Sequence, residues 1–493
     1  MELPFEKTTL RFWQQKLFTP VTKEETQEMK LPETMPDIGR VIAAWGQPVI
    51  RGKEWRSGHV GVTGGVMVWV LYAPEDGGPV RRVESWMPFT VRAEHNHSGP
   101  DGTIRAECAL CGVDARSVSP RKLMLRCQVG VMVQTMIPRE AELWTPGTMP
   151  EDIQVLERSY PMVLTRETGE RAFLVDESVQ LPGGAPERIV YSRLMPRVTE
   201  QKVLSSRAVF RGVGELHLLC QDAQGKLYST DVEVPFAQYL DLEGDYEEGA
   251  EVSNLLCVTS LETEPEEQGI RVKCGLVSQY ILNAPSVVRC AEDAYSPRRE
   301  LETVTAEVEL PAWLDEQLRQ VELAERLAGE EVPVDAIFFP DLPVVTRQPG
   351  GAEIRVGGAF HTLTEAGGTL NGKTLRTTQT VSLQTDCDTV PCTWLRGGTA
   401  VRKEGSGCAL ESRLELKLGS VCTKPVTMLS GIRAGECREP DPDRPSVIIR
   451  SRKPDETLWD IAKYCGSTVS AIQRLNKLES EPEENRLLLV PVI

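Results

Sequence analysis

The residues best suited to bind a metal ion lie in one stretch, where His95 and His97 precede Cys108 and Cys111. Histidine and cysteine are ligand types that zinc prefers. However, the Ser-Gly-Pro-Asp-Gly run after His97 predicts a hairpin turn, which pairs this histidine with the start of the next strand rather than with the cysteines. Side chains alternate along a strand, so Cys108 and Cys111 would also point to opposite faces. We therefore predict buried thiols and a polar loop, and no metal site.

Catalysis needs a nucleophile or an acid–base pair beside an oxyanion or metal site, and the common local signatures of such sites are absent. The sequence has no Gly-x-Ser-x-Gly elbow, no phosphate-binding P-loop and no His-Glu-x-x-His zinc helix. Only five histidines occur in 493 residues. We expect a protein that is not an enzyme and needs no cofactor.

The residues best placed to touch a ligand lie near the C-terminus, in the run Pro454-Asp455-Glu456-Thr457-Leu458-Trp459. Thr457 is a good helix N-cap, and a carboxylate three positions later can complete a capping box. Asp455, Glu456 and the more distant Asn476 are predicted to be exposed polar positions. Trp459 is predicted mainly to anchor a small core. Arg450, Arg452 and Lys453 lie beside the same loop, and this mixture of charges favours a protein partner at least as much as a neutral glycan.

Four elements must position these residues, and their predicted order within 446–493 is strand, helix, helix, strand. Val447–Ile449 indicates the first strand, and the Leu487–Val490 run, which Pro491 ends, indicates the last. Thr457 and Thr468 each precede apolar residues at helical spacing, as expected for two capped helices.

This stretch resembles a LysM domain, whose opening usually reads Pro-Gly-Asp-Thr-Leu-Trp-x-Ile-Ala. The residues that match the family pattern are Pro454, Thr457, Leu458, Trp459, Ile461, Ala462, Asn476 and Pro491. The sequence departs from the pattern at Asp455, where the family has glycine, and at 484–486, where Glu-Asn-Arg replaces a usual glycine. The resemblance implies a small βααβ domain. It also implies that the loops around residues 454–459 and Asn476 form a shallow groove for N-acetylglucosamine polymers.

Composition indicates several folded domains and excludes some partners. The 493 residues include 40% hydrophobic residues, enough for buried cores, and carry a net charge of -17. This acidic balance disfavours nucleic acid and anionic membranes as partners. The N-terminus does not resemble a signal peptide, and no apolar run is long enough for a transmembrane helix. The 13 scattered cysteines suit a reduced, cytoplasmic protein.

Internal repetition divides the first 300 residues into two units. Leu31-Pro32 and Pro88-Phe89 recur as Leu181-Pro182 and Pro235-Phe236, about 150 residues later. Short apolar or alternating segments separated by turn clusters indicate β-strands throughout. We predict tandem antiparallel sandwich-like or barrel-like β repeats at 1–145 and 150–300.

The region after the second repeat is predicted to begin with a helix. Trp313–Gly329 contains an apolar stripe at Leu314, Leu318 and Val321 within a charged background, so we predict a helical connector at 301–330. A degenerate third β domain is predicted at 331–435. A linker rich in proline is predicted at 436–445, before the LysM-like domain at 446–493.

The repeat unit also resembles the SPOCS domain of spore-coat and stress proteins. The resemblance rests on Leu-Pro-x-x-x-Pro-Asp-Ile at 31–38, a glycine-led strand at 65–72 and Pro88-Phe89, and it covers 25–140 and, more weakly, 175–290. Such repeats followed by a LysM domain are similar to coat-encasement morphogenetic proteins of endospore-forming bacteria. The resemblance implies a scaffold at the forespore surface, in the mother-cell cytoplasm. Its expected partner is the ATPase that forms the basement layer of the coat.

Other functions stay open at this point. The LysM-like domain could bind peptidoglycan or a precursor of it at the forespore membrane. The chain could also be a phage tail or baseplate protein, since such particles carry LysM units. Unpaired strand edges in the repeats would allow self-association.

Overall fold

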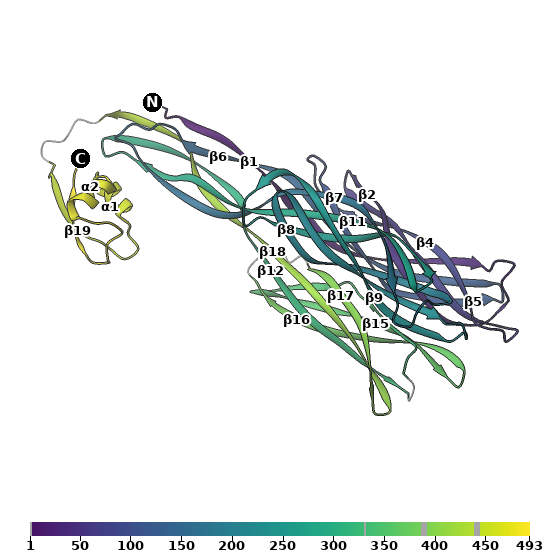
Figure 1. The fold of residues 1–493 in the computed structure, drawn as a ribbon. Coiled ribbons are helices and arrows are strands. Elements are labelled where there is room, and N and C mark those ends of the chain that lie inside the picture. Colours follow the sequence, from purple (N-terminus) through teal and green to yellow (C-terminus); the bar gives the residue numbers. More distant parts are fainter. Residues whose placement is uncertain (1, 330–331, 386–391, 438–443) are drawn as a thin grey trace.

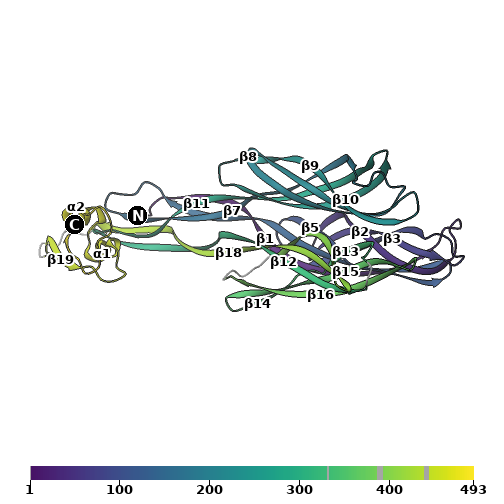
Figure 2. The same ribbon diagram turned by 60° about the horizontal axis from the view of Figure 1, so that its bottom comes forward.

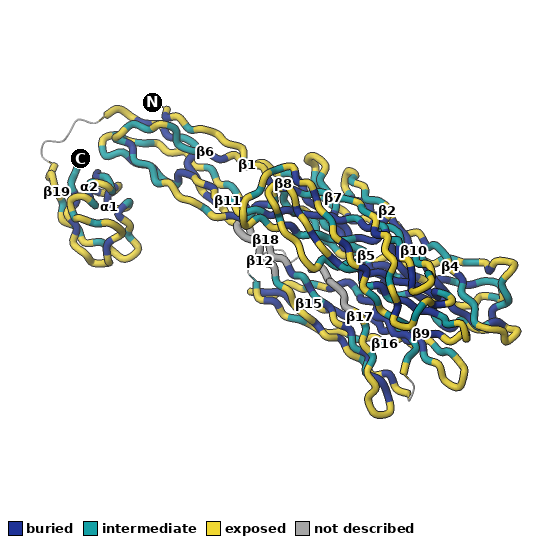
Figure 3. Tube along the Cα trace, viewed as in Figure 1, coloured by how far each residue is buried: buried dark blue, intermediate teal, exposed yellow. Residues whose placement is uncertain are grey.

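The computed structural model describes residues 2–329, 332–385, 392–437 and 444–493. Most of these residues form antiparallel strands, and the two helices both lie near the C-terminus, so the predicted mainly β fold is confirmed. Figure 1 shows a broad β body that narrows into a stalk, with the small helical domain at the far end of the stalk. Buried residues are concentrated in the body (Figure 3).

The first repeat contains six strands that form two sheets. Its first and last strands pair antiparallel along almost their whole length, and the fifth strand pairs with the last. The second, third and fourth strands form a separate sheet. The strands are β1 (Phe5–Lys30), β2 (Ile38–Arg56), β3 (His59–Pro74), β4 (Arg81–Glu94), β5 (Thr103–Ser119) and β6 (Lys122–Pro146).

The second repeat follows the same plan. Its first strand pairs with its last, and its penultimate strand also pairs with the last. One long strand replaces the second and third strands of the first repeat. This strand folds back on itself at Ser205, whose φ is 52°, so that Arg197 reaches Glu215 at 3.1 Å. The strands are β7 (Gln154–Gln180), β8 (Arg188–Gln221), β9 (Leu227–Tyr246), β10 (Glu251–Glu266) and β11 (Gly269–Tyr295).

The third repeat has the same pairing of first, penultimate and last strands. Figure 2 shows its outer strands and those of the second repeat on opposite sides of the body. Its strands are β12 (Arg299–Ala328), β13 (Asp335–Pro340), β14 (Val344–Gln348), β15 (Gly351–Ala366), β16 (Thr369–Gln384), β17 (Cys392–Glu404) and β18 (Gly407–Cys437).

The helix predicted over Trp313–Gly329 is wrong, because these residues belong to β12, which pairs with β18. Val321, Leu323 and Leu327 are buried, whereas residues 322, 324 and 326 are exposed, as the two-residue period of a strand requires. Cross-strand pairing outweighs the intrinsic helix propensity of the residues in this segment. The predicted connector at 301–330 is therefore the first strand of the third repeat, which begins at Arg299. Most of the predicted linker at 436–445 lies outside the described residues.

The stalk is built from one pair of strands of each repeat. We call the outer ends of β1 with β6, β7 with β11, and β12 with β18 the three arms. The arms contact one another, and β1 meets β7 edge to edge at Trp13 and Thr165. Leu3 adds a backbone hydrogen bond to Ile432 in the third arm, at 3.0 Å. One buried cluster of the stalk consists of Phe12, Ala141, Leu143, Met162, Leu164, Val288, Cys290, Leu310, Val426 and Met428. The three repeats therefore pack against one another through the stalk and are not separate domains arranged in a row.

A buried carboxylate joins the three repeats inside the body. Asp335 of the third repeat is 1% exposed and accepts hydrogen bonds from the Trp45 indole at 3.1 Å and the Tyr191 hydroxyl at 3.2 Å. His217 Nε2 lies 2.7 Å from the same carboxylate, and its Nδ1 lies 2.6 Å from Asp231. Burial by itself lowers the pKa of His217, but the two carboxylates outweigh it and raise this pKa to about 9.

This network predicts a loss of stability at alkaline pH. The folded-state pKa of His217 is raised above its ordinary value, so its stabilisation is complete below about pH 6.5 and disappears as pH rises through about 9. The protonated His217 side chain contributes about 3 kcal/mol to the free energy of unfolding, and this contribution is lost at alkaline pH. We expect the urea midpoint of the natural chain to fall between pH 6.5 and 9.5, and His217→Asn to remove most of that fall. The same pH dependence in both proteins would contradict this role of His217.

Candidate functional site

The C-terminal domain has the predicted order of elements. Strands β19 (Val447–Ser451) and β20 (Leu487–Pro491) pair antiparallel, and helices α1 (Leu458–Cys465) and α2 (Val469–Asn476) lie between them in sequence. A compact apolar core holds the four elements together. Its most deeply buried residues are Leu458, Ile461, Ala462, Ile472, Leu488 and Val490.

The predicted capping box is confirmed. The Thr457 side chain accepts a hydrogen bond from the backbone N–H of Asp460 at 3.2 Å, and the Asp460 carboxylate accepts one from the backbone N–H of Thr457 at 2.8 Å. The Thr457 hydroxyl and this backbone N–H lower the pKa of Asp460. Thr468 caps α2 in the same way, accepting from the N–H of Ala471 at 3.2 Å. Both helices therefore begin where the sequence indicates.

The two departures from the glycine pattern preserve the shape of the loops. Asp455 has a φ of 63° and Asn485 a φ of 61°, so both adopt the left-handed conformation that glycine adopts without strain. Aspartate and asparagine are the residues that tolerate this conformation best after glycine. The loop before α1 and the loop before β20 therefore keep a glycine-type backbone.

Hydrogen bonds join these two loops to each other. The Arg452 side chain donates to the carbonyl of Glu456 at 2.7 Å and to the carbonyl of Pro482 in the other loop. The N–H of Leu458 donates to both carboxylate oxygens of Glu481 at 3.1 Å. We call residues 452–457 and 477–486 the groove loops. These contacts join the two loops into one connected surface.

The residues predicted to bind a ligand have different environments in the structure. Pro454, Asp455 and Thr457 are exposed, whereas Leu458 belongs to the core. Glu456 is only partly exposed because it forms an ion pair with Arg450. The Asn476 side chain donates to the carbonyl of Leu489 at 2.6 Å and accepts from its N–H at 2.8 Å, and so ties α2 to β20. Among these residues, Pro454, Asp455 and Thr457 are the most accessible to a ligand.

Trp459 contacts the stalk. Its indole N–H donates to Asp293 at 2.8 Å, and its ring lies edge-on to Tyr295 with the ring centres 4.8 Å apart. Lys463, one turn later in α1, forms an ion pair with the same aspartate at 2.7 Å. Trp459 is partly buried against the LysM core and also joins the domain to the stalk, a contact that its predicted role in the core did not include. Asp293 and Tyr295 lie at the end of β11, and nothing in their local sequence indicates a partner about 170 residues away.

The stretch with His95 and His97 has no metal-site geometry. His95 Nε2 lies 3.0 Å from the carbonyl of Arg56, and His97 Nε2 lies 3.0 Å from that of Pro100. The predicted hairpin after His97 is wrong, since β4 and β5 pair with different strands. No group of three or more His, Cys, Asp or Glu side chains within the described ranges could hold a metal ion, and neither Cys108 nor Cys111 forms a disulfide.

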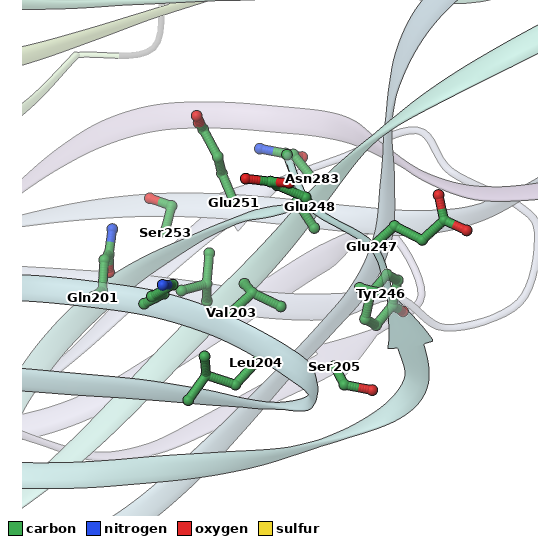
Figure 4. Close-up of a pocket in the computed structure, with 14 residues that line it drawn as sticks. Gln201, Val203, Leu204, Ser205, Tyr246, Glu247, Glu248, Glu251, Ser253 and Asn283 are labelled. Carbon is green, nitrogen blue, oxygen red and sulfur yellow. The ribbon is translucent and has the colours of Figure 1, made fainter.

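Two pockets lie beside strands of the first and second repeats. The second-repeat pocket has a volume of about 560 Å³, and Figure 4 shows it between the turn at Ser205 and the loop that precedes Glu251. The other, of about 400 Å³, lies between β2 near Lys53, the start of β5 at Thr103, and second-repeat residues that include Glu170 and Gln279. This pocket therefore lies between the first and second repeats.

A comparison with protein-family models matches residues 453–481 to the LysM domain. This match runs from the first groove loop through both helices into the second groove loop, and it confirms the LysM prediction. No curated protein and no solved structure matches the chain. The resemblance of the β repeats to SPOCS domains stays a prediction. No helix in the described part of the chain is long and apolar enough to cross a membrane.

The left-handed loop residues yield a paired prediction. Asp455→Gly should stabilise the LysM domain by up to about 1 kcal/mol, because glycine adopts a positive φ without a steric penalty. Asp455→Ala should destabilise it, since alanine carries a Cβ without the local hydrogen bonding that helps aspartate tolerate this conformation. Native-state hydrogen exchange of the α1 amides in the full chain measures both changes. A destabilised glycine variant would contradict the proposed tolerance of Asp455.

Proposed function

We propose that this chain is a non-enzymatic binding scaffold whose LysM domain attaches it to a glycan that contains N-acetylglucosamine, such as peptidoglycan. The observation that carries the proposal is the match of residues 453–481 to the LysM domain, a segment that contains most of the first groove loop and the first half of the second. The exposed Pro454 and Asp455 at the domain mouth support it further. Their loop keeps the glycine-type backbone of the family pattern.

The mouth of the domain can make the contacts that a sugar polymer requires. Exposed polar side chains of both loops, among them Asp455, Glu483, Glu484 and Asn485, supply acceptors for sugar hydroxyl groups. The Arg452 and Glu481 contacts hold the loops in place before any ligand arrives, which reduces the entropy lost on binding.

The environments of the histidines support a non-enzymatic role. Both ring nitrogens of His217 face carboxylates, and burial lowers the pKa of His361 to about 4. His95 and His97 each place a ring nitrogen against a backbone carbonyl. These four side chains are therefore engaged in structural contacts rather than poised for proton transfer.

Co-sedimentation with purified, insoluble peptidoglycan tests the glycan proposal. The double substitution Pro454→Arg with Glu484→Arg places bulky cations in both groove loops, and we expect it to weaken binding of the full chain at least tenfold. A tenfold loss corresponds to about 1.4 kcal/mol. Ile449→Arg is the matched control, because Ile449 is 68% exposed on β19 and lies outside the groove loops. Equal binding by the natural chain and both variants would exclude the groove loops as the glycan site.

We further propose that the scaffold acts in endospore coat assembly. In this proposal the β repeats bind coat components, and the LysM domain docks on the basement-layer ATPase at the forespore surface, in the mother-cell cytoplasm. The SPOCS-like motifs of the repeats support this role. The architecture supports it too, because the LysM domain sits at the stalk end, away from the broad body, so the two could engage different partners (Figure 1). The charged groove loops, with Lys453 and Glu484 exposed, suit a protein partner as well as a sugar.

Imaging of fluorescent fusions in sporulating cells tests the coat role. We expect the full chain to form a shell around the forespore, and a version truncated after Pro445 to lose it. A shell that survives truncation would move the docking role to the β repeats. A diffuse signal from the full chain would contradict the coat role and favour the phage tail alternative. Localisation that follows peptidoglycan synthesis at the forespore membrane would favour the precursor-binding alternative.

A further inference from the structure

The LysM domain packs on the stalk through a residue that completes its core. Tyr295, the last residue of β11, is 6% exposed and belongs to the same buried cluster as Leu458 and Cys465. Its hydroxyl donates to the carbonyl of Ser467 at 3.0 Å. Its ring also meets the edge of Trp459. An aromatic side chain from another domain therefore fills a position in the LysM core.

A single carboxylate provides the charged part of the same contact. Asp293 accepts from the Trp459 indole N–H and from the Lys463 ammonium, both within 2.8 Å. The aspartate side chain is 31% exposed and the lysine 46% exposed, so the ion pair lies at the rim of the contact and the tyrosine lies at its centre. A buried aromatic anchor beside a charged rim is the usual composition of a protein-binding hot spot.

We propose that the α1 face formed by Trp459 and Lys463 is a protein-binding surface for strands that carry a carboxylate and, two residues later, an aromatic ring. Alternate residues of a strand share one face, so Asp293 and Tyr295 present such a pair. In this chain the end of β11 occupies the surface. It thus acts as an internal competitor for any partner that carries the same pair of side chains.

The internal contact sets the conditions under which a partner can bind. A tethered competitor acts at an effective concentration of about a millimolar, so a partner strand must bind more tightly than β11 or arrive when β11 is released. The groove loops take no part in the contact with Asp293 and Tyr295. This surface therefore goes beyond the proposed glycan site and does not depend on it.

Charge reversal in the full chain tests the internal contact. Asp293→Lys should repel Lys463 and remove the acceptor of the Trp459 indole, which opens the contact and withdraws Tyr295 from the LysM core, and we expect small-angle X-ray scattering to show a larger radius of gyration. Adding Lys463→Asp to this variant should restore the ion pair and the compact radius. A radius unchanged by Asp293→Lys would overturn the proposed role of this ion pair.

A peptide tests the recognition chemistry. The probe is a fluorescent synthetic copy of residues 287–296 with serine in place of Cys290, and its binding is followed by anisotropy. The Asp293→Lys chain should bind it at least tenfold more tightly than the natural chain, whose surface is occupied. Adding Trp459→Ala should abolish that binding, and a peptide with lysine at the position of Asp293 should not bind. Equal affinity of the natural and Asp293→Lys chains, or no binding to either, would overturn the proposal. Retained folding of the Trp459→Ala chain is checked by its hydrogen exchange.

Discussion

The packing of the three arms against one another is the constraint on which the rest of the structure depends. Each arm consists of the outer ends of the paired first and last strands of one repeat. The strand pair that belongs to the sheet of a repeat therefore continues into the stalk. Met162, Leu310 and Met428, one residue from the second arm and two from the third, are 3% exposed or less in the stalk core. Burial of such side chains contributes about 1.5–3 kcal/mol each, which no single arm could obtain alone. The Asp335 network makes the corresponding connection inside the body.

The position of the LysM domain follows from this constraint. The end of β11 is the end of the second arm, and it presents Asp293 and Tyr295 to α1. Pro454, Asp455 and Glu484 of the groove loops stay exposed. The scaffold proposal combines these two features, a broad β body at one end and an accessible LysM surface at the other (Figure 1).

Local signals in the sequence predict some parts of this structure and miss others for physical reasons. Helix caps are local, so Thr457 and Thr468 mark α1 and α2 correctly. Recurring motifs such as Leu31-Pro32 and Leu181-Pro182 mark the first two repeats. Strand β12 was missed because its residues favour a helix in isolation, and only pairing with β18 selects the strand. The sequence does not predict that Asp293 and Tyr295 contact Trp459, because a contact between residues far apart in the sequence has no local sequence signal.

Hydrogen–deuterium exchange of the full chain, with and without soluble N-acetylglucosamine oligomers, tests whether the groove loops bind the glycan. We expect slower exchange in residues 452–458 and 477–486 when the oligomer is bound. We also expect unchanged exchange in the three β repeats, since the glycan contacts only the tip of the molecule. Protection confined to the repeats, or no protection at oligomer concentrations that saturate other LysM domains, would contradict the assignment of the LysM domain as the glycan-binding end of this scaffold.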